Sequence, residues 1–412
     1  MKNNLRALRG ALAVALALTV ISCGGGGGKA GVASHTQPAA GSNVATVIVD
    51  AGPLPTTQPS VNTLFTTVTI CMPGSTTQCA TIDHVQVDTA SFGFRVLAAA
   101  LPSGFTLPVV TLPNGAGSLV ECTVFGDGYS WGPVARADFT IAGESVASMP
   151  LQVIGDSRFS TVPTACSSSS TVAVEEDTVA AFGANAIIGI GVEPSDCPAC
   201  AQQTGPKVYF ACTTATACTE TMVPSADLVP NPISDFATDN NGSLLVLPSV
   251  RLAGSATVTG SLIFGVDTQT KNQSGSQTVA FIDPNNAELT MVYKGTPLTD
   301  SFIDSGTNGI YFSDTTLTTC PGNASAFYCP SSTQNLPLGI NLHNGSVFNT
   351  NFNVVNADTL TNAMAAFPGL AGTLPASLDG FDWGLSFFYG RRVATVIAGN
   401  TTSAGTGPYI AF

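Results

Sequence analysis

Short stretches in which apolar and polar residues alternate run along most of this chain. Residues 43–50 and 64–71 alternate with a period of two, which is the spacing of a strand with one buried face. Further strands are predicted where the alternation recurs or where a compact apolar run is closed by glycine. They cover residues 120–125, 138–141, 151–154, 186–191, 261–267, 290–293 and 381–397. The pattern therefore predicts an all-β protein.

Helical patterns are scarce in the sequence. Residues 357–367 are the best candidate, because Asp358 can cap the first turn and Pro368 can end the helix. A tight hairpin is predicted at residues 126–128, where Gly-Asp-Gly separates two β-rich runs. The expected helices beside the strands are therefore few and short.

Two short stretches, one in each half of the chain, repeat the same order of residue types. Residues 85–96 and 301–312 both contain an apolar strand end, an Asp, a hydroxyl residue, a small residue, a second hydroxyl residue and a further apolar strand. The two turns are Asp88-Thr89-Ala90-Ser91 and Asp304-Ser305-Gly306-Thr307. A carboxylate in an apolar setting is costly unless nearby groups use it. Two matching copies therefore predict one site that is built from a pair of aspartates and lies between two related lobes.

Residues 1–22 have the pattern of a signal peptide and are set aside from the fold. A basic start is followed by an apolar run that is too short to span a bilayer as a mature helix. Residues 20–23 resemble the bacterial lipobox, so Cys23 is expected to carry a lipid anchor. The alternative is an ordinary signal peptide with an incidental cysteine. Gly24, rather than Asp, after the cysteine fits sorting to an outer membrane, and residues 23–43 are expected to form the lipidated start and a flexible linker.

Charge and composition narrow the possible partners. Removing Lys2, Arg6 and Arg9 with the leader takes the 13 basic side chains to 10 against 26 acidic ones, for a formal charge near −16. Such an acidic surface repels the phosphate backbone of a nucleic acid, so nucleic acid is not expected as a partner. Only 9% of residues are charged, which suits an exported β-rich protein on the periplasmic or surface face of the membrane. A monomer is expected.

Eleven cysteines are present, and ten remain for the folded part if Cys23 is lipidated. An even number in an oxidising compartment indicates disulfides. Short spacings suggest the pairs Cys71–Cys79 and Cys320–Cys329, and Cys122–Cys166 is a further candidate pair. The pairing stays open in the cluster Cys197, Cys200, Cys212 and Cys218. The Cys-x-x-Cys motif of this cluster also occurs in metal sites and redox pairs, but no histidine is nearby. Disulfides are therefore favoured in the cluster, which is expected to be a surface insertion.

The two turns and the segments around them resemble those of pepsin-like aspartic proteases. In that family each lobe supplies one Asp-Thr/Ser-Gly turn, and a later apolar-apolar-Gly segment packs beneath it. Residues 187–189 fit this segment in the first half, and residues 382–384 fit it more loosely in the second. The hairpin at residues 126–128 lies where the family has its substrate-covering flap.

Two further strands extend the resemblance to about residues 45–400. Residues 262–267 are similar to the mid-chain strand of the family, and residues 383–396 are similar to its terminal strand. The resemblance implies a bilobal pepsin-like fold with lobes at residues 44–253 and 254–412. The chain as a whole also resembles a family of exported Gram-negative proteins described only as a domain of unknown function, which adds no chemistry.

The resemblance assigns roles to the turn residues. Asp88 and Asp304 would share one proton and activate a water against a peptide bond. Ser91 and Thr307 would hold the carboxylates through outer hydrogen bonds. The remaining supporting residues of the pair are Thr89, Ser305 and Gly306, and the flap comprises Phe125, Gly126, Asp127, Gly128 and Tyr129.

Two functions of different classes follow from these residues. A lipid-anchored aspartic endopeptidase acting on peptides or unfolded protein is favoured by the retained aspartate pair. A catalytically inactive surface lipoprotein that binds peptide or glycan is favoured by two departures from the family pattern. These are Ala90 in place of Gly and Phe125 in place of the flap Tyr.

Other chemistry has weaker support in the sequence. Residues 155–157 and 143–145 are similar to serine-hydrolase turns, but His84 and His343 are the two histidines outside the linker that could serve as a base. No glycine-rich loop leads from a strand into a helix, so no cofactor is expected. Acidic and amide residues at 235–241 favour a polar loop over a calcium site, and no metal is expected.

Overall fold

The structure is a computed structural model that describes residues 43–168, 174–275, 278–283, 286–375 and 378–412. The predicted signal peptide, the lipidated Cys23 and the linker up to residue 42 lie outside the described residues. Strands dominate the part of the chain that is described, so the predicted all-β class is confirmed. No helix in that part is long and apolar enough to cross a membrane.

Twenty-five strands are assigned in the described residues. Those of the first half are β1 (Val44–Val49), β2 (Leu64–Cys71), β3 (Cys79–Asp88), β4 (Phe92–Leu97), β5 (Thr111–Leu112), β6 (Gly117–Val124), β7 (Tyr129–Ile141), β8 (Glu144–Ile154), β9 (Ala186–Ile190), β10 (Tyr209–Thr214), β11 (Ala217–Glu220) and β12 (Gly242–Val246). Those of the second half are β13 (Val258–Phe264), β14 (Val279–Phe281), β15 (Leu289–Tyr293), β16 (Thr296–Ile303), β17 (Ile310–Phe312), β18 (Gln334–Asn341), β19 (Val347–Val354), β20 (Ala371–Thr373), β21 (Asp382–Trp383), β22 (Arg392–Val396), β23 (Thr401–Thr402), β24 (Gly405–Thr406) and β25 (Tyr409–Ala411).

The α-helices are α1 (Thr164–Ser167) and α2 (Val179–Phe182), each a single turn. The prediction of a helix at residues 357–367 is wrong. The segment forms a 3-10 turn at Ala357–Thr359 and continues as loop. The N–H groups of Ala365 and Ala366 both donate to the carbonyl of Ser255 at 2.9 Å, so contacts with another segment replace the helical hydrogen bonds.

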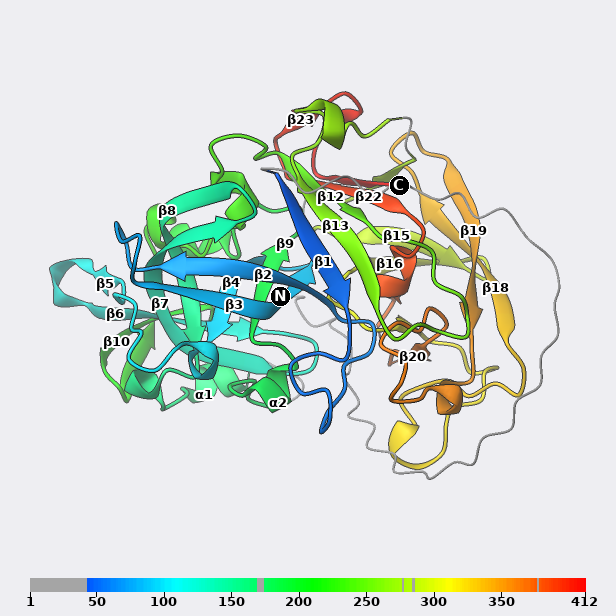
Figure 1. Ribbon diagram of the computed structural model, residues 1–412, viewed down its shortest axis with the longest axis horizontal. Coiled ribbons are helices and arrows are strands. Elements are labelled where there is room, and N and C mark those ends of the chain that lie inside the picture. Colours follow the sequence, from blue (N-terminus) through cyan, green and yellow to red (C-terminus); the bar gives the residue numbers. More distant parts are fainter. Residues whose placement is uncertain (1–42, 169–173, 276–277, 284–285, 376–377) are drawn as a thin grey trace.

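One large sheet runs through both halves of the chain (Figure 1). Its strand order is β11-β10-β6-β7-β8-β4-β9-β3-β2-β1-β13-β12-β22-β25-β14, with β5 attached to β6. In the middle of this order, β1 pairs antiparallel with β13, and β12 pairs with both β13 and β22. Figure 1 shows these strands side by side between the first half and the second half. Main-chain hydrogen bonds therefore join the two halves.

A second sheet of seven strands belongs to the second half, in the order β19-β18-β15-β16-β21-β17-β20. The predicted boundary between residues 253 and 254 falls in the connection between β12 and β13. These strands are hydrogen-bonded neighbours in the large sheet. The division into two lobes at that point therefore stays a prediction.

Buried aromatic rings stabilise the strands of the second sheet that surround the Asp304 turn. Phe312 on β17 stacks on Phe381 with ring centroids 5.3 Å apart and meets Phe352 on β19 edge-on at 5.2 Å. All three side chains are buried. Aromatic pairs in this geometry contribute about 0.5–1.5 kcal/mol each beyond their buried area. The cluster fixes β17, the strand after the turn, relative to β21, which pairs with both β16 and β17.

Five disulfides are present, and the open cysteine cluster resolves into two local pairs. The bonds are Cys71–Cys79, Cys122–Cys166, Cys197–Cys200, Cys212–Cys218 and Cys320–Cys329. Cys197, Cys200 and Cys212 are buried, while residues 202–207 and 213–217 are exposed, so the expectation of a surface insertion stays a prediction. Strand β10 pairs with β6 and so carries this segment into the large sheet.

Candidate active site

Asp88 lies at the end of β3, and the strands beside it fix its position. It pairs with Gly189 of β9 in the parallel ladder. A Cβ at Gly189 would lie 2.4 Å from the backbone nitrogen of Phe92, so glycine is needed for this close packing. The carboxyl accepts two hydrogen bonds from its own turn, from the N–H of Ala90 to Oδ1 at 2.8 Å and from the hydroxyl of Ser91 to Oδ2 at 2.5 Å. These bonds orient the carboxyl.

Asp304 follows β16 and has the same surroundings. Its backbone N–H donates to the carbonyl of Trp383 at 3.1 Å, and a Cβ at Gly384 would lie 2.3 Å from the carbonyl oxygen of Thr307. The carboxyl again accepts two bonds from its turn. The N–H of Gly306 donates to Oδ1 at 2.7 Å and the hydroxyl of Thr307 donates to Oδ2 at 3.0 Å. The two turns are therefore built to one design.

Thr89 and Ser305 connect the two turns to each other. The N–H of Thr89 donates to Ser305 Oγ at 3.1 Å, and the N–H of Ser305 donates to Thr89 Oγ1 at 3.0 Å. Each hydroxyl then donates to a carbonyl of the opposite half, from Thr89 to Ile303 at 3.3 Å and from Ser305 to Val87 at 2.8 Å. All of these bonds are buried. They hold the ends of β3 and β16 face to face.

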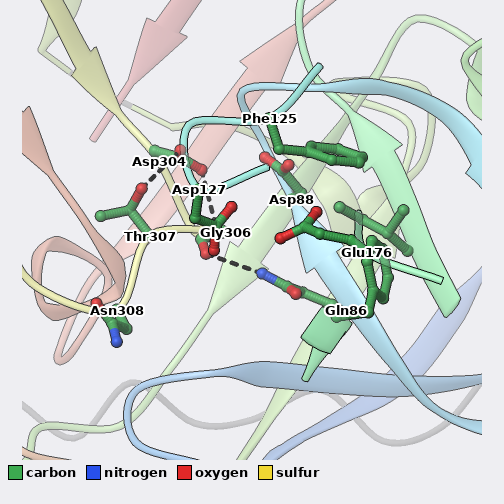
Figure 2. A pocket seen from close by; sticks show the side chains of 11 residues that line it. Gln86, Asp88, Phe125, Asp127, Glu176, Asp304, Gly306, Thr307 and Asn308 are labelled. Carbon is green, nitrogen blue, oxygen red and sulfur yellow. Dashed lines mark hydrogen bonds between the residues drawn. The ribbon is translucent and has the colours of Figure 1, made fainter. Parts of the chain in front are cut away.

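Asp88 and Asp304 line the same small cavity (Figure 2). Gly306 lies between them, because its N–H binds Asp304 while a Cβ at its position would be 2.6 Å from Asp88 Cγ. The side chain of Gln86 donates to the carbonyl of Gly306 at 2.8 Å and fixes this backbone from below. The cavity holds about 30 Å³, which is room for about one or two waters.

The hairpin predicted from its glycines is present between β6 and β7, and it contributes residues to the cavity lining. Phe125 and Asp127 line the cavity, with the chain bending at Gly126 and Asp127 (Figure 2). The N–H of Phe125 donates to the carbonyl of Gly128 at 2.8 Å and closes the hairpin. The ring of Phe125 packs edge-on against Phe182, with centroids 5.8 Å apart. The hairpin therefore presents an apolar ring and a carboxyl to the site.

Tyr129, predicted as part of the flap, and Trp131, which follows it on β7, lie outside the cavity lining. Both belong to a buried cluster with Phe159 and are not among the cavity-lining residues. The indole N–H of Trp131 donates to the carbonyl of Phe159 at 2.8 Å. Burial and the charges of Glu175 and Asp177 raise the pKa of Tyr129. Neither ring takes the place of the flap tyrosine that Phe125 replaces.

Glu176 is a cavity residue that the sequence analysis does not identify. Its backbone lies along the hairpin, because the N–H of Tyr129 donates to the carbonyl of Val174 at 2.9 Å and the N–H of Glu176 donates to the carbonyl of Tyr129 at 2.8 Å. The Glu176 side chain is buried and lines the cavity together with Asp88 (Figure 2). In sequence it is the middle of three acidic residues, 175–177, a pattern that is typical of an exposed loop.

Four carboxyls line the cavity: Asp88, Asp127, Glu176 and Asp304. The described lining residues include no Lys, Arg or His. Asp88, Glu176 and Asp304 are buried, and Asp127 is half-buried. The arrangement brings several carboxyls into one small space, and carboxyls are among the groups that serve in general acid–base catalysis.

The residues predicted as alternative catalytic or metal-binding groups are not among those that line this cavity. His84 lies beside Asp50 and Asp83, with N···O distances of 3.5 and 3.2 Å. Among the described residues, the group of potential metal ligands comprises Cys320, Cys329 and Asp358. The two sulfurs are joined to each other in a disulfide, so the group offers no thiolate to a metal.

A second buried polar cluster lies between the Asp88 turn and the hairpin. Arg95 on β4 donates from Nε to Glu121 on β6 at 3.1 Å and to Thr123 at 2.8 Å, and from an Nη to the carbonyl of Phe92 at 2.5 Å. Its other Nη contacts Glu121 and lies 3.4 Å from Asp196. Burial lowers the pKa of Arg95, but the charges of Glu121 and Asp196 outweigh it and raise the pKa overall.

Asp196 completes this cluster with Tyr209. The tyrosine hydroxyl lies 2.9 Å from both carboxyl oxygens of Asp196 and accepts a bond from the N–H of Val229 at 2.8 Å. Burial and the charge of Glu121 raise the pKa of Asp196 well above its usual range. One guanidinium thus faces two carboxyls, and the cluster joins the backbone after the Asp88 turn to the strand that carries the hairpin.

Comparisons with known proteins give a family and a structural likeness. The sequence matches the family model described as "Protein of unknown function (DUF3443)" over residues 39–412. No curated protein matches the sequence. Among solved structures, the crystal structure of aspartic proteinase from Irpex lacteus is similar, with 16% sequence identity and a TM-score of 0.46. That alignment covers 89% of this chain and 96% of the Irpex lacteus chain.

Proposed function

This chain belongs to the family described as "Protein of unknown function (DUF3443)", and we propose that it is an aspartic endopeptidase of pepsin-like, bilobal design. The observation that carries the proposal is the pair of matching turns. Asp88 and Asp304 each accept an N–H and a hydroxyl hydrogen bond from their own turn, and both line one cavity. The substrate class is a peptide or unfolded protein.

The proposed reaction uses one ionised and one protonated aspartate. The ionised carboxyl takes a proton from a water in the cavity, and that water attacks the carbonyl carbon of the peptide bond. The protonated carboxyl donates a hydrogen bond to the carbonyl oxygen as negative charge develops there. The crossed bonds between Thr89 and Ser305 hold the two turns together, so the carboxyls on these turns keep their positions during the step.

The proposal includes attachment to the outer membrane of a Gram-negative cell through a lipid on Cys23. Its support is the lipobox-like sequence before Cys23 and the glycine-rich linker after it. The experiment is mass spectrometry of the protein purified from membranes of a bacterial host, beside Cys23→Ser. The expected wild-type N-terminus is a diacylglyceryl cysteine, and an unmodified chain cleaved at another residue would contradict the anchor.

A second function is a catalytically inactive binding module for peptide or glycan. The observation that favours it is the size of the cavity, about 30 Å³, since Phe125, Asp127 and Glu176 occupy the space above the aspartates. For this function, we propose that the hairpin and the segment at residues 174–177 keep a peptide bond from reaching the pair. The two functions therefore differ in whether this cover opens.

The test is cleavage of a denatured protein by the chain starting after Cys23, across pH 3 to 7, with and without pepstatin. Wild type is compared with Asp88→Asn, Asp304→Asn and a matched control, Asp358→Asn, which changes an exposed carboxyl away from the site. Cleavage in acid that is lost in both site variants and kept in the control supports the endopeptidase. Folded wild-type protein that cleaves at no pH supports the binding module instead.

A further inference from the structure

The two halves of the site differ at one buried position. In the first half, Ile187 of β9 pairs with Gln86, two residues before the Gly189 that faces Asp88. In the second half the same place, two residues before Gly384, is taken by Asp382 of β21, which pairs with Phe302. Ile187 is 3% exposed and Asp382 is 2% exposed. An apolar side chain in one half is therefore replaced by a buried carboxyl in the other.

Asp382 reaches the site through the hydroxyl of Thr307. Thr307 Oγ1 lies 3.0 Å from Asp304 Oδ2 and 2.9 Å from Asp382 Oδ2. A hydroxyl has one hydrogen to donate, so it cannot donate a full hydrogen bond to two ionised carboxylates at once. The arrangement is satisfied when one of the two carboxyls is protonated and donates to Thr307, while Thr307 donates to the other. A chain of two hydrogen bonds then connects Asp304 to Asp382.

This chain can run in either direction. With the proton on Asp382, the order is Asp382 O–H to Thr307, and Thr307 O–H to ionised Asp304. Moving the Asp382 proton to Thr307 while the Thr307 proton passes to Asp304 transfers one proton between the carboxyls and leaves Thr307 unchanged. The first half has no such chain, because Ile187 has no exchangeable proton at the equivalent place.

We infer that Asp382 is a positioning residue that acts on Asp304 through Thr307. Asp304 and Asp382 together keep a proton to a higher pH than the catalytic pair Asp88 and Asp304 would without Asp382. The inference rests on the proposed function for its catalytic meaning. Two carboxyls that share buried contacts disfavour each other's ionisation, so the second proton of the pair leaves at a higher pH. The working range of the peptidase then extends toward neutral pH.

Other ionisable groups lie near Asp304 and Asp382, and the substitutions of Asp382 tested below leave these groups unchanged. Asp88, Asp127 and Glu176 face Asp304 across the cavity. Tyr311 of β17 pairs with Asp382 in the sheet, and its hydroxyl donates to the side chain of Asn308 at 2.8 Å. Arg391 stacks on the ring of Trp383 at 5.7 Å, on the opposite side of β21 from Asp382, because successive side chains of a strand alternate.

The first measurement is the pH profile of kcat/KM for wild type, Asp382→Asn and Asp382→Ile. Asparagine preserves the shape of the side chain, and isoleucine is the residue that the first half accommodates. As the pH rises, both variants are expected to lose kcat/KM earlier than wild type does. Their alkaline limb should be shifted by about one pH unit toward acid. Asp358→Asn is the control and keeps the wild-type limb. An unmoved limb in folded Asp382 variants overturns the inference.

The second measurement does not require activity. Melting temperatures of wild type, Asp382→Asn, Asp304→Asn and the double variant are compared from pH 3 to 7. A carboxyl that keeps its proton in the folded state destabilises the protein as pH rises above the unfolded value of about 4. The Tm of Asp382→Asn relative to wild type should therefore increase between pH 4 and pH 7. The increase in Tm of the double variant should be smaller than the sum of the increases of the two single variants. Either substitution alone relieves the repulsion between the carboxyls of Asp304 and Asp382.

The two measurements separate the inference from the proposed function. A wild-type protein without cleavage at any pH, combined with the pH-dependent gain in Tm, supports the Asp304–Asp382 pair while the peptidase proposal fails. Acid cleavage by wild type with an unmoved limb and a Tm difference that is independent of pH overturns the inference and leaves the peptidase in place.

Discussion

Thr89 and Ser305 each donate a backbone N–H to the other's hydroxyl, at 3.1 and 3.0 Å, across the gap between the two aspartate turns. Each residue therefore completes the turn of the opposite half. Ser305→Ala removes an acceptor for the Thr89 N–H and the donor to Val87, both buried. Leaving buried polar groups unsatisfied costs about 1–3 kcal/mol each.

We therefore expect Ser305→Ala to lower the free energy of unfolding by about 2–4 kcal/mol and to abolish cleavage. Urea unfolding followed by tryptophan fluorescence measures the first effect. Thr67→Val, at an exposed position of β2, is the control and should change stability by less than about 0.5 kcal/mol. Equal unfolding midpoints for Ser305→Ala and the control would contradict a structural role for the crossed bonds.

Gly306 has no space for a side chain. A Cβ at this position would lie 2.6 Å from Asp88 Cγ, closer than carbon atoms approach. Gly306→Ala is expected to push the Asp88 carboxyl out of place, with a loss of at least about tenfold in kcat/KM, since small displacements of catalytic groups cost this much or more. The matched change in the other turn is Ala90→Gly, which adds no atom and is expected to keep activity within about threefold. Similar activity in Gly306→Ala and wild type would show that the carboxyl tolerates the displacement.

Glu176 narrows the space above the aspartates. Its side chain is buried and lines a cavity of about 30 Å³. If the segment at residues 174–177 restrains access, Glu176→Ala enlarges the cavity, and cleavage of a denatured protein should rise several-fold. Glu175→Ala, the neighbouring acidic residue, is the control for the loss of one negative charge. A decrease in cleavage by folded Glu176→Ala would mean that this carboxyl supports the site and does not restrain it.

Arg95 is a buried cation with two carboxyl neighbours, Glu121 and Asp196. Arg95→Met leaves those carboxyls without their guanidinium, and removing one partner of a buried ion pair costs about 3–5 kcal/mol. Arg158 forms an ion pair with Asp156 at the surface and is 42% exposed, so Arg158→Met should cost less than about 1 kcal/mol. Chemical denaturation of both variants measures the difference. Equal losses would contradict the assignment of the Arg95 cluster as a structural link to the hairpin.

Asp314 provides a test of pH-dependent stability away from the cavity. Its carboxyl accepts bonds from Tyr293 at 2.6 Å, from Lys294 at 2.9 Å and from the hydroxyl of Thr316 at 2.6 Å. Burial alone would raise the pKa of Asp314, but these hydrogen bonds lower it from 3.8 to about 2. The stabilisation is therefore present above pH 4 and is lost as the pH falls through 4 toward 2.

Asp314→Asn removes this stabilisation. We expect it to cost about 1–2 kcal/mol at pH 6 and progressively less as the pH approaches 2. Unfolding free energies at pH 2, 3, 4 and 6 measure this dependence. A cost that stays constant over this range would mean that the effect comes from packing and not from the ionised carboxyl.

The parts of the fold that depend on local sequence could be predicted. Alternation along residues 64–71 corresponds to β2 (Leu64–Cys71), and the glycines at 126 and 128 correspond to the hairpin over the cavity. The two Asp turns have the same internal hydrogen bonds because each follows a strand of the same local design. In each case a few neighbouring residues contain the information.

The parts that depend on distant contacts could not be predicted. Glu176 is buried because its backbone pairs with Tyr129, and nothing in the acidic run at residues 175–177 indicates that partner. Asp382 contacts Thr307 across 75 positions of sequence. The segment at residues 357–367 has a helical pattern, yet Ser255 binds its N–H groups. Such pairings are set by the topology of the sheets rather than by the local pattern.

The five disulfides join each cysteine of the described residues to the next one along the chain, and the widest pair is separated by 44 positions. A chain that crosses a membrane from its N-terminus presents these thiols in that same order. Each new thiol then finds its correct partner as the one most recently exposed. If the chain is exported as proposed, oxidation in order of emergence yields the native set without reshuffling of the disulfides.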